Sequence, residues 1–217
     1  KSLLQQLKID YKNAIDNKIS LNPILNSFQE VYHEYDFEPE LVDSFFRSME
    51  LDLDPQFYTE KLYNEYIYGS AEVVGLMCLK VFVKGDAEKY DELKDSAKKL
   101  GSAFQKVNFL RDLEFDNNEL GRTYFPNVDF SNITNRQKDE IIKDISSDFN
   151  DSLIGLKKLD RDSFLGVYVA FRYYKELLFK IKKANLKDLK STRIRVSNAK
   201  KISLVINSTI KFNAGLI

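Results

Sequence analysis

Four side chains that carry oxygen donors recur at helical spacing in the segment AFQKVNFLRDLEFDNNELGRTYFP. They are Gln105, Asn108, Asp112 and Asp116, at successive steps of three, four and four residues. At about 100° per residue, these steps place all four on one stripe of an α-helix. Carboxylate and amide oxygens are the hard ligands that Mg²⁺ prefers, and this ion keeps room for water and phosphate oxygens. The row therefore predicts a magnesium site that also receives phosphate groups.

Two arginines accompany this row. Arg122 follows it, whereas Arg111 lies within the segment but off the stripe, where an ion pair that holds the helix is an equally good role. The guanidinium fork binds phosphate oxygens in pairs. Two aspartates four residues apart on a charged helix are usually a solvated face, and Asp112 and Asp116 alone favour that interpretation. The full row, followed by GRTYFP, favours the metal site.

The composition excludes several classes of protein. The chain has 217 residues with 33 basic and 33 acidic side chains, which argues against binding nucleic acid through bulk charge. A single cysteine, Cys78, excludes an internal disulfide framework, and a single histidine, His33, excludes a multi-histidine metal site. We assign both residues to structural roles and expect a cytoplasmic location. No apolar run approaches the roughly 18 residues of a membrane span.

Apolar residues recur at helical spacing almost throughout, so we expect an all-α, single-domain protein. Asp86 is the expected N-cap of one helix, and Thr134 with Gln137 forms the expected capping box of another. The apolar stripe of the helix that carries the oxygen row contains Leu93, Ala97, Leu100, Phe104 and Val107. The expected helices span residues 1–17, 22–35, 38–50, 55–82, 86–116, 134–158, 161–185 and 197–213.

The two ends of the chain carry further expectations. The first residue is Lys1 rather than Met, which predicts a chain trimmed at its N-terminus. The last segment, KKISLVINSTIKFNAGLI, is amphipathic. Such a helix suits peripheral contact with a membrane surface, although packing on the helical bundle is the more common role.

The oxygen row and its surroundings resemble the second aspartate-rich motif of the squalene/phytoene synthase family, N-x-x-R-D-x-x-x-D followed by G-R-x-Y-x-P. The block NEYIYGSAEVVGLMCLKVF is similar to the family's tyrosine helix, SFFRSMELDLDP to its M-x-x-D block, and STRIRVSNAKK to its closing basic stretch. The blocks occur in the family's order along the whole chain. Within the family, the sequence resembles bacterial phytoene synthases more than eukaryotic squalene synthases. The matching residues are Met49, Asp52, Tyr66, Tyr68, Ala71, Val74, Gly75, Leu76, Met77, Asn108, Arg111, Asp112, Asp116, Gly121, Arg122, Tyr124 and Pro126.

Three departures from the family pattern stand out. Ser70 and Glu72 replace small or apolar residues of the tyrosine helix. The family's first aspartate-rich motif is missing. The acidic string at residues 38–45 is not this motif, because it lies directly before the M-x-x-D block. The order of the blocks therefore implies that the motif belongs upstream of Lys1. The resemblance therefore implies that residues 1–217 are an isoprenoid-synthase bundle around a central cavity, without its first helices. We expect this shortening to expose an apolar groove and to leave the chain, if it is all that exists, weakly active or inactive.

The resemblance also implies a reaction and its participants. The family joins two isoprenoid diphosphates head to head through a cyclopropylcarbinyl diphosphate, and two geranylgeranyl diphosphates give phytoene. The implied catalytic residues are Asp112, Asp116 and Tyr66, and the implied cofactor is Mg²⁺. The implied ligands of the metal are Asn108, Asp112 and Asp116, and those of the substrate are Gln105, Arg122, Arg193 and Tyr174. Tyr66 and Tyr174 would favour a carbocation through their ring faces.

Two alternatives remain open at this stage. A squalene or dehydrosqualene type of synthase would use farnesyl diphosphate, and the lack of a G-x-G-x-x-G motif does not decide against a step with NADPH. A non-catalytic family member would act as a helical binding or assembly protein. The chain length of the substrate and the oligomeric state are not fixed by the sequence.

Overall fold

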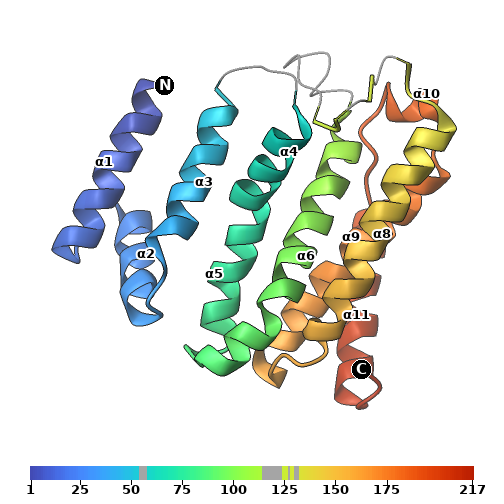
Figure 1. Cartoon of the computed structure of the whole chain (residues 1–217). Helices are drawn as coiled ribbons and strands as arrows, with labels where there is room; N and C mark the ends of the chain where they lie inside the picture. The colour runs from blue at the N-terminus through green and yellow to red at the C-terminus, as the bar shows by residue number, and fades with distance from the viewer. Residues whose placement is uncertain (54–57, 114–123, 127, 130–131) are drawn as a thin grey trace.

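The computed structural model describes residues 1–53, 58–113, 124–126, 128–129 and 132–217. Within these ranges the regular secondary structure is entirely helical (Figure 1). The elements are α1 (Ser2–Asn17), α2 (Pro23–Glu34), α3 (Pro39–Leu51), α4 (Glu60–Ile67), the π-helical turn η1 (Tyr68–Glu72), α5 (Val73–Phe82), α6 (Ala87–Arg111), α8 (Asn135–Leu156), α9 (Arg161–Lys183), α10 (Leu186–Leu189) and α11 (Asn198–Asn213). The predicted all-α fold is confirmed.

Helix α6 is the central rod of the bundle (Figure 1). It packs against η1 and α5 on one side and against α8 and α9 on the other, while α11 packs on the outside of α9. The main core lies around α6, with Val107, Leu110, Ile145, Phe149 and Leu177 fully buried. No helix in the described part of the chain is both long and apolar enough to span a bilayer.

The two expected N-terminal caps are confirmed, but one expected helix end is wrong. The Asp86 side chain accepts the Lys89 N–H, and Thr134 forms a reciprocal capping box with Gln137. Helix α6, expected to continue through residue 116, ends at Arg111, and Asp112 is its C-cap, with φ −98° and ψ 10°. The oxygen row therefore does not lie on one continuous helix, and Asp116 lies outside the described residues.

The helix expected over 55–82 begins only at Glu60, and it is not one continuous α-helix. Thr59 caps its start, and the helix is interrupted by η1, where the Val73 N–H donates to the Tyr68 carbonyl oxygen, five residues back. At this turn Gly69 faces α3 so closely that a Cβ there would lie 2.2 Å from the Ser44 carbonyl oxygen. The π turn thus lies where η1 and α3 approach each other so closely that their backbones are in contact.

Replacing Gly69 with alanine is expected to destabilise the fold. The added methyl group has no space against the Ser44 carbonyl, so α3 or η1 must shift, at a cost of about 1–3 kcal/mol. Urea unfolding followed by circular dichroism measures this loss. The matched control is Gly166→Ala in α9, where a Cβ meets nothing within 4 Å; equal midpoints for the two variants would contradict the close approach.

A buried ionic cluster joins α6 to α8. Asp148 is only 2% exposed and accepts from Lys99 Nζ at 2.8 Å, Lys106 Nζ at 2.7 Å and Ser102 Oγ at 3.2 Å. Lys106 also donates to Asp144 at 2.6 Å. Because these partners are fixed in position on both helices, the cluster sets the axial register of α6 against α8. The sequence did not predict it.

Candidate active site

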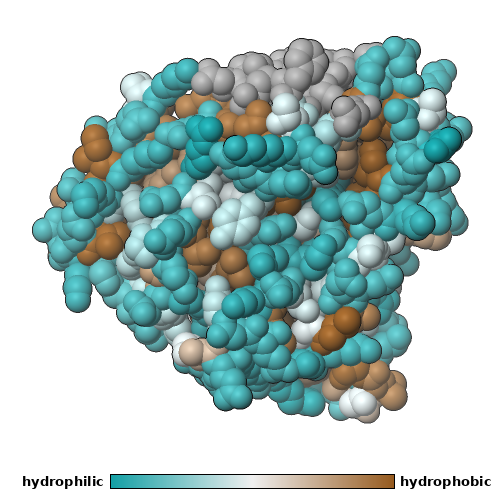
Figure 2. Space-filling model, viewed as in Figure 1, coloured by the Kyte–Doolittle hydropathy of each residue, from teal (hydrophilic) through white to brown (hydrophobic). Residues whose placement is uncertain are grey.

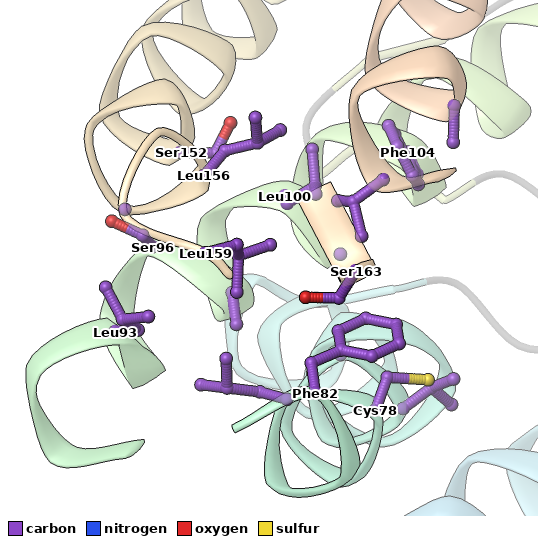
Figure 3. Close-up of a pocket in the computed structure, with 18 of the residues that line it drawn as sticks. Cys78, Phe82, Leu93, Ser96, Leu100, Phe104, Ser152, Leu156, Leu159 and Ser163 are labelled. Carbon is purple, nitrogen blue, oxygen red and sulfur yellow. The ribbon is translucent and has the colours of Figure 1, made fainter. Parts of the chain in front are cut away.

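An apolar cavity of about 620 Å³ lies between α5, α6, α8 and α9 (Figure 3). Four residues of the predicted apolar stripe of α6 line it, from Leu93 to Phe104, which confirms that this stripe faces inward. Phe82 and Cys78 contribute from α5, and Leu156 contributes from α8. Carbon atoms dominate these walls, so the cavity suits a hydrocarbon chain.

Toward the C-terminal end of α6, side chains with oxygen donors follow those that line the cavity. Gln105 lines the cavity, and Asn108 and Asp112 follow it by about 4.5 and 10 Å along the helix axis. The side-chain oxygen Oδ1 of Asn108 is buried without a hydrogen-bond partner among the described residues. A buried acceptor that lacks a partner costs about 1–3 kcal/mol, which is offset when a ligand binds to it.

Asp112 is held by two arginines from distant parts of the chain. The Arg111 Nε donates to Oδ1 at 3.0 Å, and Arg193 Nε lies 2.6 Å from the same oxygen. Arg193 comes from the segment between α10 and α11, so the fold brings two predicted site residues into contact. The hydrogen bond to Asp112 raises the pKa of the Arg111 guanidinium. This carboxylate therefore gathers positive charge around itself.

These donors fit Mg²⁺ in kind. Asn108 supplies an amide oxygen without a partner among the described residues, and Asp112 supplies a carboxylate. Both oxygens of Asp112 accept from Arg111 and Arg193 in this structure, so a metal ion would have to replace an arginine there. Among the described residues, no group of three or more acidic, histidine or cysteine side chains is arranged to hold a metal. Asp116 and Arg122, which were also predicted for this site, lie outside the described ranges.

Tyr66 lies in a buried aromatic cluster next to the M-x-x-D block. Its hydroxyl donates to the two carboxylate oxygens of Asp52 at 3.1 and 3.2 Å. Its ring packs against Tyr58, Phe109 and Tyr124 at centroid distances of 5.5, 5.8 and 5.4 Å. Burial, with the neighbouring Tyr124 and Asp52, raises the pKa of Tyr66, so the phenol stays neutral. The sequence did not predict the contact between Tyr66 and Asp52.

Tyr174 supports the cavity wall from behind. Its ring stacks on Phe104 at a centroid distance of 4.0 Å and an interplanar angle of 16°. Phe104 is the ring that lines the cavity, and the described lining includes neither Tyr174 nor Tyr66. Tyr174 therefore lies one layer behind the cavity wall, whereas Tyr66 packs in a separate aromatic cluster with Tyr58, Phe109 and Tyr124.

Sequence reasoning missed one functional candidate, Ser70. It lines the cavity from η1, and its Oγ is buried without a partner among the described residues. The available signal was its departure from the apolar residue expected in the tyrosine helix. Glu72, the second departure, has a raised pKa because burial outweighs the attraction of Lys98. Both unusual residues thus lie in or beside the π turn.

Comparisons with known proteins agree with this geometry. A family model described as squalene/phytoene synthase matches residues 1–200. The structure resembles that of a dehydrosqualene synthase in complex with a ligand, with a TM-score of 0.79, 23% identity, and coverage of 99% of this chain and 79% of that one. It also resembles squalene synthase HpnC from Alicyclobacillus acidocaldarius, with a TM-score of 0.71, 16% identity, and coverage of 84% and 73%.

No curated protein matches the sequence. The family match nevertheless spans more than nine-tenths of the chain, and the dehydrosqualene synthase structure shares its helical fold over 99% of the chain. These likenesses agree with the order of the motifs and with the apolar cavity beside the Asn108 and Asp112 oxygens. The chain belongs to the squalene/phytoene synthase family, whose members are head-to-head prenyltransferases.

Proposed function

We propose that this protein is a phytoene synthase-type prenyltransferase that joins two geranylgeranyl diphosphates head to head. The observation that carries the proposal is the apolar cavity of about 620 Å³ that Gln105 lines, with the Asn108 and Asp112 oxygens further along the same helix and Arg193 paired with Asp112. A prenyl diphosphate has the same division, with a long hydrocarbon chain and a charged head. The cavity would take the chain, and the polar end would take the diphosphate.

The polar residues of this chain would have different roles at the diphosphate group. Asn108, Asp112 and the motif residue Asp116 would hold Mg²⁺, and Arg193 and Arg122 would bind diphosphate oxygens directly. When bound, Mg²⁺ supplies the positive charge that lets the diphosphate depart as an anion. Gln105 lies at the boundary between the two regions and would orient C1 of the substrate.

The apolar walls would protect the cationic stage of the reaction. As the C1–O bond of one substrate breaks, the double bond of the second substrate supplies the electron pair for the new bond, and a proton leaves. The resulting cyclopropylcarbinyl diphosphate then loses its own diphosphate, rearranges and loses a second proton to give phytoene. Exclusion of water would prevent premature capture of the cations, and the ring of Phe104, which lines the cavity and stacks on Tyr174, would favour positive charge there. Tyr66 would act on a cation only where the substrate reaches its aromatic cluster with Phe109.

The proposal is tested by incubating the full-length protein with labelled geranylgeranyl diphosphate or farnesyl diphosphate, each with Mg²⁺. We expect a C40 hydrocarbon from the first substrate. A C30 product formed only from farnesyl diphosphate would support the squalene or dehydrosqualene alternative instead. Turnover of neither substrate would move the function to binding or assembly.

Gly166 offers a separate test of the cavity. It lines the cavity from α9, and a Cβ there meets nothing within 4 Å, so a larger side chain has room to extend into the hydrocarbon space. We expect Gly166→Leu to lower kcat/KM for geranylgeranyl diphosphate about tenfold more than for farnesyl diphosphate. Gly166→Ala is the control, with a smaller change. An equal loss for both substrates would argue against this cavity as the prenyl site.

A further inference from the structure

Three charged side chains from two distant segments meet at the C-terminal end of α6. Most of the face that Figure 2 shows is hydrophilic, with hydrophobic residues in separate patches, so ionic contacts shape much of this surface. Arg111 donates from Nε and Nη2 to the two oxygens of Asp112. Arg193 places Nε 2.6 Å from Oδ1 and donates from Nη2 to Oδ2 at 3.3 Å. Two guanidinium forks therefore hold one carboxylate.

This double pairing fills the Asp112 carboxylate. A carboxylate offers about four lone-pair sites on its two oxygens. Four guanidinium nitrogens lie against the two oxygens of Asp112, two from each arginine. A cation can reach these oxygens only when one of the arginines leaves. The chain itself thus supplies a competitor for the carboxylate that would hold Mg²⁺.

The two arginines differ in how firmly they are held. Arg111 lies on the same helix as Asp112, near Tyr173 and Tyr174 of α9, and its side chain is only 18% exposed. The side chain of Arg193 is 49% exposed. Ion pairs that water reaches are weak, because water and salt screen them. Arg193 is therefore the arginine that can leave Asp112 at little cost.

The backbone that carries Arg193 is anchored, so only its side chain has to move. In the segment between α10 and α11, Val196 is 3% exposed and Ile194 packs against the main core, whereas Arg193 and Arg195 are exposed. The carbonyl oxygen of Arg195 also accepts from Lys180 Nζ at 3.2 Å. An arginine side chain has many rotamers, and its guanidinium can change partner about a fixed Cα.

We propose that Arg193 exchanges partners: it neutralises Asp112 until a diphosphate binds, then moves to the diphosphate oxygens and releases the carboxylate. This exchange rests on the diphosphate site proposed above. The guanidinium fork fits phosphate oxygens as well as a carboxylate, and a diphosphate carries more negative charge than one aspartate. The affinity of Asp112 for a cation is reduced by the fraction of molecules in which Arg193 occupies it. Diphosphate and cation binding are thus coupled through one side chain.

The test is a double-variant cycle for the binding of inorganic pyrophosphate to the full-length protein, measured by calorimetry with EDTA present. Asp112→Asn releases Arg193, and we expect it to tighten pyrophosphate binding at least about fivefold. In the Arg193→Gln background, the same substitution should change the affinity less than about twofold. Charge effects that act independently are additive, so equal changes in the two backgrounds overturn the proposal. Asp95→Asn on the same helix is the matched control and should leave the affinity unchanged.

A titration with Mn²⁺ alone keeps the proposal testable if Asp112→Asn does not fold. Arg193→Gln should bind Mn²⁺, followed by its electron paramagnetic resonance signal, at least about fivefold more tightly than the wild type. The control is Arg195→Gln, which removes the same charge two residues away. No gain for Arg193→Gln, or an equal gain for the control, overturns the exchange, as does pyrophosphate binding to none of the proteins.

Neither measurement depends on turnover, so the exchange and the reaction can fail separately. A C40 product together with additive effects on pyrophosphate binding would overturn the exchange and leave the synthase. Non-additive effects without any product would support the exchange and remove the proposed reaction. Circular dichroism of each variant checks that the helices are retained.

Discussion

Asp112→Asn is expected to lower the turnover of labelled prenyl diphosphate by at least about 100-fold. The substitution keeps the size of the side chain but removes the negative charge that attracts Arg111 and Arg193 and that would hold Mg²⁺. Removal of one group that stabilises developing charge commonly costs a factor of 100 to 1,000 in kcat, as an order of magnitude. Formation of hydrocarbon product, measured at saturating substrate, gives this loss directly.

The control for this experiment is Asp95→Asn on the same helix. The Asp95 side chain is 81% exposed and pairs only with Lys98, one turn away, among the ion pairs of the described residues. The two variants make the same chemical change, and circular dichroism and thermal unfolding compare their folds. Full turnover by Asp112→Asn would show that this carboxylate does not serve the reaction, whatever the fold.

Asp148→Asn is expected to destabilise the protein by about 1–3 kcal/mol. Asp148 is buried and accepts from two lysines, and removal of one partner of a buried ion pair leaves the other charge without compensation. The Lys106 ammonium keeps Asp144, which limits the loss, but Lys99 loses its partner. Urea unfolding gives the free energy of unfolding for the variant and the wild type.

Two further variants make this result specific. Asp91→Asn removes a solvent-exposed partner of Lys94 on the same helix and should cost less than about 1 kcal/mol. The double variant Lys106→Met/Asp148→Leu removes the buried charges together and should recover much of the stability. A loss for Asp148→Asn no larger than that for Asp91→Asn would mean that the cluster is not what holds α6 against α8.

Local patterns predicted most of the fold. Helical periodicity placed the main helices, and the caps at Asp86 and Thr134 are confirmed because a cap needs only residues within one turn. The end of α6 was wrong for the opposite reason. Asp112 departs from helical geometry where it pairs with Arg193, 81 residues along the chain, and no local pattern contains that contact.

In the candidate site too, local features could be predicted and long-range contacts could not. The apolar stripe from Leu93 to Phe104 was readable because its spacing follows one helix, and it lines the cavity. The hydrogen bond from Tyr66 to Asp52 joins two elements whose relative placement depends on the whole bundle. The family resemblance identified the tyrosine helix, which carries Tyr66, and the M-x-x-D block, which carries Asp52, but it did not predict that these two residues are in contact. Ser70 was visible only as a departure from the family's tyrosine helix.

The π turn at residues 68–72 sets how far α5 is rotated about the helix axis relative to α4. One extra residue in a helix advances everything beyond it by about 100° around the axis. Before the turn, Tyr66 points toward Asp52, and after it, Val74 and Cys78 point into the cavity. Deleting one residue here would restore an even pitch but rotate one half relative to the other, so only one set of partners could be kept. The number of residues in this turn therefore sets the angle between the helix surface that faces Asp52 and the helix surface that faces the cavity.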